Sequence, residues 1–149
     1  MSKDLHTKVA VCSRSFSRNE ILRKELLEEY QHVTFNDKGI SLIGDKLEHF
    51  LKGQDKAIIA LEPITDQLLC KLPELKVISK YGVGLNNLSK SDLIKHSIKL
   101  GWEGGVNKRA VAELTIGFML SLMRDLSNHG TNLRNNIWEP KVGKDLSSQ

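Results

Sequence analysis

Residues 104–126 read GGVNKRAVAELTIGFMLSLMRDL, and this stretch predicts a long helix. Asn107 is expected to cap the helix, because its side-chain oxygen can accept hydrogen bonds from the free N–H groups of a first turn. Arg124 suits the negative end of the helix dipole, and Gly130 is expected to end the helix. Only ten residues separate Glu113 from Arg124, which is too few to span a bilayer.

The apolar residues of this helix point in all directions around its axis; they are Val111, Leu114, Ile116, Phe118, Met119, Leu120, Leu122 and Met123. A helix that is apolar on every side has to be buried on every side. Two environments would bury it, the centre of a single core or contact with a second copy of the same helix. We therefore expect a long buried helix.

The first hundred residues alternate between strand and helix signals. Short apolar runs bounded by polar residues predict strands at residues 9–12, 33–35, 57–61, 75–79 and 98–100. Helix patterns and capping residues predict helices at 19–30, 40–51 and 65–70, and a further helix from Ser89 or Ser91 to residue 96. Residues 13–18 read as a polar loop. This alternation predicts an α/β fold, with a parallel five-stranded sheet covered by helices on both faces and followed by the long buried helix.

Composition limits the possible functions. The chain has 149 residues, 22 basic and 18 acidic, and its net charge of +4 is spread without a block of like charge, so no nucleic-acid binding is expected. The five histidines lack ligand spacing, which predicts no metal site. Cys12 and Cys70 are expected to be reduced and buried in a cytoplasmic protein. Neither a secretory leader nor a membrane span is predicted.

A glycine-containing turn follows the fourth predicted strand, where residues 80–87 read KYGVGLNN. Gly82 and Gly84 permit a tight turn whose N–H groups can bind an anion, although a plain strand-to-helix turn would have the same sequence. Ligands of parallel sheets bind at the carboxyl ends of the strands. The segments predicted to lie at this edge are residues 13–17, 61–64, 80–87 and 101–107.

Other interpretations of the glycine turn and of the fold fail on particular residues. A dinucleotide-binding G-x-G-x-x-G loop would need glycine at position 87, where Asn87 stands, and the next helix begins too late to face a pyrophosphate. A phospho-receiver domain would need acidic residues after the first strand and an aspartate at the end of the third. Cys12-Ser13 and Leu61-Glu62 stand there instead.

Two motifs in this order resemble the D-isomer-specific 2-hydroxyacid dehydrogenases, and in particular their phosphoglycerate dehydrogenase-like members. The first is LPELKVISKYGVGLNNL at residues 72–88, and the second is the helix sequence that begins at Gly104. The resemblance implies that residues 1–100 are a flavodoxin-like substrate-binding (catalytic) domain. It also implies that residues 101–149 begin a truncated dinucleotide-binding domain, whose helix at 107–126 forms a dimer interface.

The resemblance further implies which residues bind ligands. Substrate contacts are expected from Tyr81, Gly82, Val83, Gly84 and Asn107, with the substrate carboxylate on the N–H groups of Val83 and Gly84. Val83 and Asn107 are also expected to lie beside the cofactor, NAD. The loop at residues 62–65 is expected to face the substrate.

The chain departs from the family in two ways. Asn86 stands where the family usually has aspartate. The family's nucleotide loop and its catalytic arginine, glutamate and histidine have no counterpart in this sequence, so no catalytic residue is assigned and tight NAD binding is expected only in a full-length parent. We therefore expect an N-terminal portion of an NAD-dependent D-2-hydroxyacid dehydrogenase that is inactive alone, binds a small 2-hydroxy or 2-keto acid and forms a homodimer through 107–126. The alternative is a non-enzymatic module for small-anion binding or dimerisation.

Overall fold

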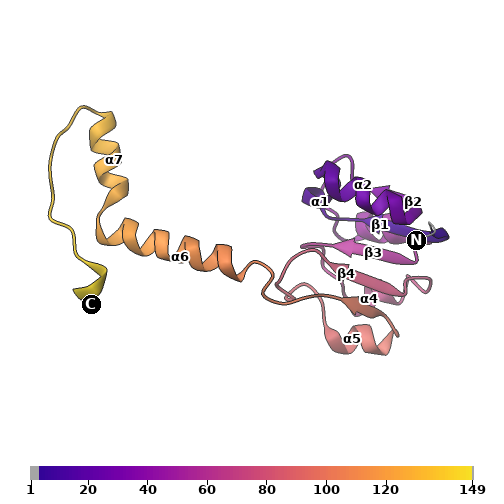
Figure 1. Cartoon of the computed structure of the whole chain (residues 1–149). Helices are drawn as coiled ribbons and strands as arrows, with labels where there is room; N and C mark the ends of the chain where they lie inside the picture. Colours follow the sequence, from indigo (N-terminus) through magenta and orange to yellow (C-terminus); the bar gives the residue numbers. More distant parts are fainter. Residues whose placement is uncertain (1–3, 149) are drawn as a thin grey trace. The chain divides into compact units, whose positions relative to one another are not determined.

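The computed structural model describes residues 4–148, so residues 1–3 and 149, at the outer ends of the two predicted domains, lie outside the described part. The chain forms two compact units, one up to Gly104 and one from Gly105 onward. The first unit contains the sheet, and the second contains helices (Figure 1).

The sheet of the first unit has five parallel strands in the order β2-β1-β3-β4-β5 (Figure 1). The strands are β1 (Asp4–Val11), β2 (Tyr30–Phe35), β3 (Lys56–Ile59), β4 (Val77–Lys80) and β5 (Lys99–Gly101). This strand order is the flavodoxin-like one. The predicted α/β fold with a five-stranded parallel sheet is confirmed.

The helices of the first unit are α1 (Arg14–Arg18), α2 (Glu20–Glu29), α3 (Asp45–Leu51), α4 (Asp66–Leu69) and α5 (Lys90–Lys95). Asn19, Thr65 and Ser89 cap α2, α4 and α5, because each side-chain oxygen accepts a hydrogen bond from an N–H group in the first turn. The starts at Asn19 and Thr65 are confirmed predictions, and of the two starts predicted for α5, Ser89 rather than Ser91 is the cap. In each case a polar residue that can accept a hydrogen bond stands directly before a helical pattern.

Two local predictions in the first unit are wrong. The loop predicted after β1 is helical, because Ser13 Oγ accepts from the Phe16 N–H at 3.2 Å and starts α1. The helix predicted from residue 40 begins only at Asp45. Before it, Asn36 holds residue 40 through two hydrogen bonds, and Gly44 turns the chain with φ 54°.

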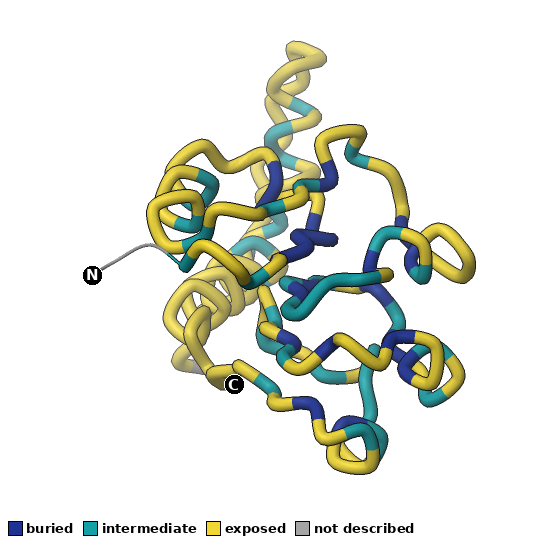
Figure 2. The backbone as a smooth tube through the Cα atoms, turned by 90° about the vertical axis from the view of Figure 1, so that its right-hand side faces the viewer, coloured by how far each residue is buried: buried dark blue, intermediate teal, exposed yellow. Residues whose placement is uncertain are grey.

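The core of the first unit lies against the sheet, and every buried residue among residues 4–147 belongs to this unit (Figure 2). One cluster joins sheet residues to the helices α3, α4 and α5; its members include Ala10, Cys12, Ala57, Ile59, Ile78, Leu47, Leu51, Leu69 and Leu93. Strand residues alternate between faces, so Val9 and Val11 face the other side, where Phe16 of α1 is also buried. Burying each large side chain stabilises the fold by about 1.5–3 kcal/mol.

The two cysteines differ in burial. Cys12 is fully buried at the end of β1, as predicted, whereas Cys70 is exposed. The prediction of a buried Cys70 is wrong because this residue is the C-cap of the four-residue helix α4, whose inward position is taken by Leu69.

The second unit contains α6 (Lys108–Met123), α7 (Leu126–Arg134) and a short 3₁₀ helix, η1 (Leu146–Ser148). The single helix predicted over 107–126 is therefore wrong at its C-terminal end. Asp125 adopts a left-handed conformation with φ 48°, which interrupts the helical path after α6. Gly130 does not end the helix but lies within α7.

Burial of α6 within the core of a single chain is a wrong prediction, whereas burial against a second copy stays a prediction. None of its residues is buried, and seven of its large apolar side chains from Val111 to Leu122 are 45% to 82% exposed. Asn107 precedes α6 but makes no capping hydrogen bond, because its φ of −105° and ψ of 9° belong to a turn rather than to extended backbone. Within residues 4–148, no helix has both the length and the hydropathy to cross a membrane.

Candidate functional site

The glycine turn Tyr81–Gly84 lies at the carboxyl end of β4. The Tyr81 N–H donates to the Ile59 carbonyl at 2.7 Å, which fixes the start of the turn on β3. Gly82 has φ 138°, a backbone conformation that residues other than glycine rarely adopt. Among the contacts of the described chain, the N–H groups of Gly82, Val83 and Gly84 donate to no protein acceptor. The turn therefore presents consecutive N–H groups that are available to an anion.

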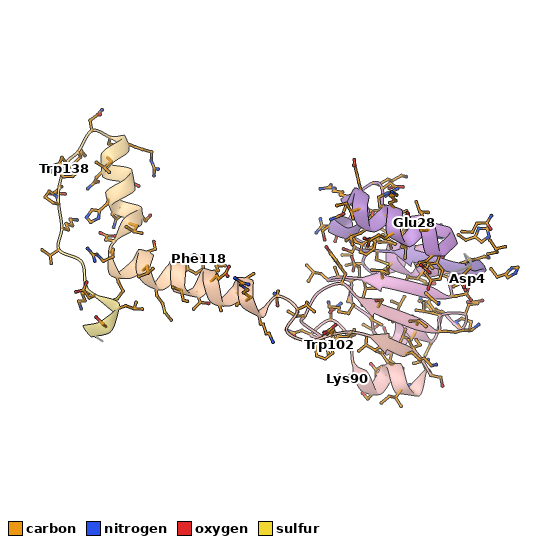
Figure 3. The ribbon with its side chains drawn as sticks, viewed as in Figure 1. Asp4, Glu28, Lys90, Trp102, Phe118 and Trp138 are labelled. Atoms are coloured by element: carbon orange, nitrogen blue, oxygen red, sulfur yellow. The ribbon has the colours of Figure 1, made fainter. Side chains whose placement is uncertain are left out.

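The segments predicted to meet at this edge do so on both sides of the turn. The Tyr81 ring packs edge-on against Phe16, with ring centroids 5.3 Å apart. The Val83 carbonyl accepts from Trp102 Nε1 at 3.1 Å, and the Lys90 ammonium lies 5.6 Å from the centre of the Trp102 ring. Figure 3 labels Trp102 and Lys90 close together in the first unit.

A network of hydrogen bonds made by Lys80 and Asn87 flanks the turn. The Lys80 ammonium donates to the Ala60 carbonyl and, at 2.8 Å, to Asn87 Oδ1. The Asn87 amide donates in turn to the carbonyls of Glu62 at 2.6 Å and Ala60 at 3.3 Å. The Asn87 carbonyl accepts from the Ile64 N–H at 2.8 Å. These bonds hold the segment after β3 to the segment after β4.

The sequence predicts that both of these segments lie at one edge, but it does not reveal the pairing of Lys80 with Asn87. Nothing in the periodicity links a lysine and an asparagine seven residues apart. The only signal in the sequence is that both stand beside the glycine turn at a predicted strand end.

Two charged groups, the partly buried Lys80 and the buried Glu62, set the electrostatics beside the turn. Burial lowers the pKa of Lys80, and the nearby Glu62 carboxylate partly opposes this shift. Glu62 is itself buried, and its Oε2 accepts from the Ala60 N–H at 2.6 Å. Lys80 Cε lies 3.9 Å from the position that a Gly82 Cβ would occupy, so the cationic side chain runs close to the turn. An anion bound at the turn would lie near this positive charge.

The Cys12 thiol at the end of β1 is chemically inert by the same reasoning. Burial, and secondarily the Glu62 carboxylate, raise its pKa. A nucleophilic cysteine needs the opposite shift, because the thiolate is the reactive form. Cys12 therefore acts as a core residue.

Two predicted positions are not brought to the turn by any described contact. Asn107 belongs to the second unit, so its part in the site stays a prediction. Thr65, the last residue of the predicted substrate-facing loop, uses its hydroxyl to cap α4 by accepting from the Leu68 N–H at 3.2 Å.

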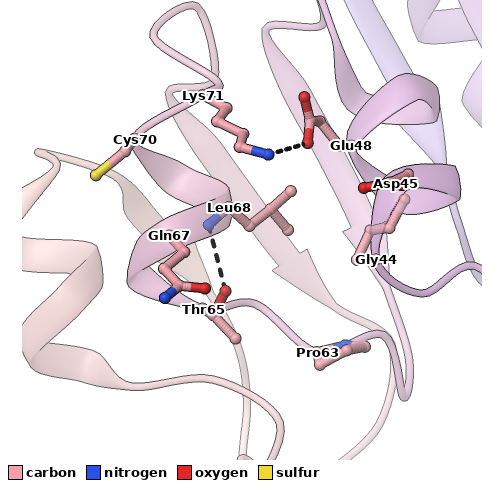
Figure 4. A pocket seen from close by; sticks show the side chains of 10 residues that line it. Gly44, Asp45, Glu48, Pro63, Thr65, Gln67, Leu68, Cys70 and Lys71 are labelled. Carbon is pink, nitrogen blue, oxygen red and sulfur yellow. Dashed lines mark hydrogen bonds and ion pairs between the residues drawn. The ribbon is translucent and has the colours of Figure 1, made fainter.

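A depression lies between α3 and α4, away from the glycine turn (Figure 4). Its charged groups pair with each other, since Lys71 Nζ and Glu48 Oε2 are 2.6 Å apart, and the Glu48 carboxylate raises the pKa of Lys71. This pairing leaves little reason for a charged ligand to bind there, so the glycine turn is the better candidate site.

Comparison with known proteins places this arrangement in one family. Residues 9–144 match the family described as D-isomer specific 2-hydroxyacid dehydrogenase, catalytic domain. A hydroxypyruvate reductase of Thermotoga maritima is 34% identical over 74 residues, which are 48% of this chain and 24% of that protein. A D-3-phosphoglycerate dehydrogenase of Methanocaldococcus jannaschii is 26% identical over 82% of this chain and 23% of its own length.

The fold agrees with solved structures of the family. The apo structure of D-lactate dehydrogenase from Escherichia coli superposes with a TM-score of 0.70 at 20% identity, covering 89% of this chain and 42% of that one. This chain thus spans less than half the length of the relatives it matches. The extent of the family match shows that the chain belongs to the D-isomer-specific 2-hydroxyacid dehydrogenases.

Proposed function

We propose that this chain is the N-terminal, substrate-binding portion of an NAD-dependent D-2-hydroxyacid dehydrogenase. The Tyr81–Gly84 turn holds the carboxylate of a small 2-hydroxy or 2-keto acid on the N–H groups of Val83 and Gly84. The observation that carries this proposal is the run of unpaired N–H donors beside the Lys80 side chain. Such an edge of a parallel sheet is where ligands bind in open α/β folds.

The substrate class follows from what the relatives are called. Hydroxypyruvate, D-3-phosphoglycerate and D-lactate each carry a carboxylate beside an oxygen-bearing carbon. A turn that binds only the carboxylate serves all of them. Discrimination among these acids therefore has to come from groups outside residues 82–84.

The proposal for the residues that contact the cofactor rests on the family resemblance. In the complete enzyme we place Val83 and Asn107 beside NAD, with residues 1–100 as the substrate domain and residues 101–149 as the start of the nucleotide-binding domain. The enzyme is proposed to work in the cytoplasm, where the two free thiols of Cys12 and Cys70 remain reduced.

This chain alone is proposed to bind its acid without transferring hydride. Its sequence contains no G-x-G-x-x-G loop, and no contact within residues 4–148 brings a histidine to the turn as a general acid or base. Pure protein incubated with NADH and a panel of 2-keto acids should leave the NADH absorbance at the background rate. NADH consumption above that rate would contradict the proposal that this chain binds the acid without transferring hydride.

The α6 helix is proposed to pair with α6 of a second copy. Its exposed apolar side chains form a larger patch than monomers usually leave in water. A two-fold symmetric contact buries such a patch on both chains at once, because each chain contributes the same surface.

The carboxylate site can be tested with two glycine variants. Gly82→Ala forces a side chain into φ 138° at the turn, and we expect it to weaken binding of 2-hydroxy acids at least tenfold by calorimetry or ligand-observed NMR. Gly53→Ala is the matched control, because Gly53 also has a positive φ of 72° but precedes β3 at the opposite edge of the sheet. Equal binding by both variants and the parent chain would refute the site.

A further inference from the structure

Outside the glycine turn, three side chains of metal-binding type converge on the surface of the first unit. Asp66 is the first residue of α4, Cys70 is the C-cap of the same helix, and His96 is the C-cap of α5. His96 Nε2 lies 2.7 Å from Asp66 Oδ1 and 4.0 Å from Cys70 Sγ. One donor atom from each residue lies within 4.8 Å of the other two.

The backbone holds these residues in place without any ligand. Thr65 caps α4, and the Cys70 N–H donates to the Asp66 carbonyl at 3.0 Å, which brings these residues to the same side of the helix. The His96 N–H donates to the Asp92 carbonyl at 3.0 Å. Leu69 and Leu93, each 2% exposed, fix the two helices in the core. The convergence is thus built into the fold rather than made by loose side chains.

We infer that Asp66, Cys70 and His96 form a binding site for Zn²⁺. Thiolate, imidazole and carboxylate are the three ligand types that zinc takes in proteins, whereas Mg²⁺ and Ca²⁺ prefer oxygen ligands alone. Around a tetrahedral zinc ion, donor atoms stand roughly 3.3–3.8 Å apart, as follows from metal–ligand distances of about 2.0–2.3 Å. The observed spacings bracket this range, so small side-chain rotations suffice. Three protein ligands leave the fourth position to water or to a small ligand.

A hydrolytic Cys-His-Asp triad is excluded by the same geometry. In such a triad the nucleophile contacts one ring nitrogen of the histidine and the carboxylate orients the ring through the other. Here both Cys70 Sγ and Asp66 Oδ1 approach Nε2 of His96. Two groups that converge on one nitrogen can share a metal ion but cannot pass a proton through the ring.

Lys95 competes with the ion for Asp66. Its ammonium lies 2.8 Å from both carboxylate oxygens, and this contact, followed by that of His96, lowers the pKa of Asp66. The Lys95 side chain is 61% exposed and can move into solvent. Zinc binding therefore replaces the His96–Asp66 hydrogen bond and displaces or shares the Lys95 contact.

The sequence predicts no metal site because the histidines show no ligand spacing among themselves. The signal that this criterion misses combines Asp66 and Cys70, four residues apart, with a single histidine at the end of the next helix. Only the tertiary packing of α4 and α5 brings His96 to the pair.

The test titrates the full chain with Zn²⁺ by calorimetry and with Co²⁺ by absorption spectroscopy. We expect one saturable site per chain, with a thiolate-to-cobalt charge-transfer band. Cys70→Ser should abolish that band although Cys12 is still present, because Cys12 is buried. His96→Gln should weaken zinc binding by at least the ~10–100-fold that changes in the outer shell of a metal site cost.

Two further variants keep the test decisive if a ligand variant fails to fold. Lys95→Gln removes the competing cation and should tighten zinc binding several-fold. His49→Gln changes an exposed histidine on α3 and should bind as the parent chain does. The absence of saturable zinc binding by the parent chain would overturn the site, and so would Cys70→Ser and His96→Gln variants that bind unchanged.

Discussion

At the scale of single residues, Asn87 joins the segments that follow β3 and β4. Replacing it with alanine removes donors from the Glu62 and Ala60 carbonyls and an acceptor from the Lys80 ammonium. We expect Asn87→Ala to lower the unfolding free energy of the first unit by about 1–3 kcal/mol, because part-buried polar groups lose their partners. Asn86→Ala, next to it but exposed, should change stability by less than about 0.5 kcal/mol. Equal urea midpoints for the two variants would contradict the network.

Asp4 gives a pH prediction at the start of β1. Its carboxylate accepts hydrogen bonds from the Thr7 hydroxyl and from the N–H groups of Thr7 and His6, which lower its pKa from 3.8 to about 2. Well above pH 4 the group is ionised in both states, and these bonds stabilise the fold. On acidification the unfolded chain binds the proton first, so this contribution falls between about pH 4 and 2. The stability gap between the parent chain and Asp4→Asn should close over that window. An NMR titration in which the Asp4 carboxyl of the folded chain has its midpoint near pH 4 would contradict the lowered pKa.

The sequence predicts well those residues whose hydrogen-bond partners lie only a few positions away along the chain. The caps Asn19, Thr65 and Ser89 need only the helix that follows them, and all three are observed. The pairing of Lys80 with Asn87 and the approach of His96 to Cys70 depend on how separate elements pack. Neither leaves a pattern in the chain itself.

At the scale of elements, the strands were predictable because each is a short apolar run that must enter the core. Helix boundaries were less predictable where backbone geometry overrides the pattern. Gly44 delays the start of α3, and the left-handed Asp125 divides the predicted long helix. The apolar character of α6 is evident in the sequence, but burial needs a partner surface, and the sequence of one chain does not show whether it is supplied.

Because α7 continues past Gly130, a substitution at this glycine should change the stability of the helix. This glycine lies inside α7, and no heavy atom lies within 4 Å of the position that an alanine Cβ would occupy, so Gly130→Ala should stabilise the helix by about 0.5–1 kcal/mol. Gly105→Ala is the opposing control, since its φ of 73° disfavours any side chain. Helix content can be followed by circular dichroism on heating. A loss of helix in Gly130→Ala would place this glycine at a helix end instead.

At the scale of the whole molecule, the exposed α6 predicts self-association. Light scattering should give the mass of two chains for the parent protein. Replacing both Phe118, 60% exposed, and Leu122, 82% exposed, with aspartate should give the mass of one, because a dimer would have to bury the new charges. Ile21→Asp and Ile94→Asp, at exposed apolar positions of α2 and α5, should leave the dimer intact. A monomeric parent chain, or a dimer that survives the α6 changes, would refute this interface.

The turn after β4 is proposed to bind the carboxylate of a 2-hydroxy acid. Residue-resolved amide NMR of the parent chain, titrated with D-lactate and D-glycerate, tests this proposal most directly. We expect saturable shifts of the Val83 and Gly84 N–H signals, with smaller shifts at Phe16 and Trp102, whose side chains contact Tyr81 and Val83. Shifts that leave residues 82–84 unmoved and gather elsewhere would contradict the proposal.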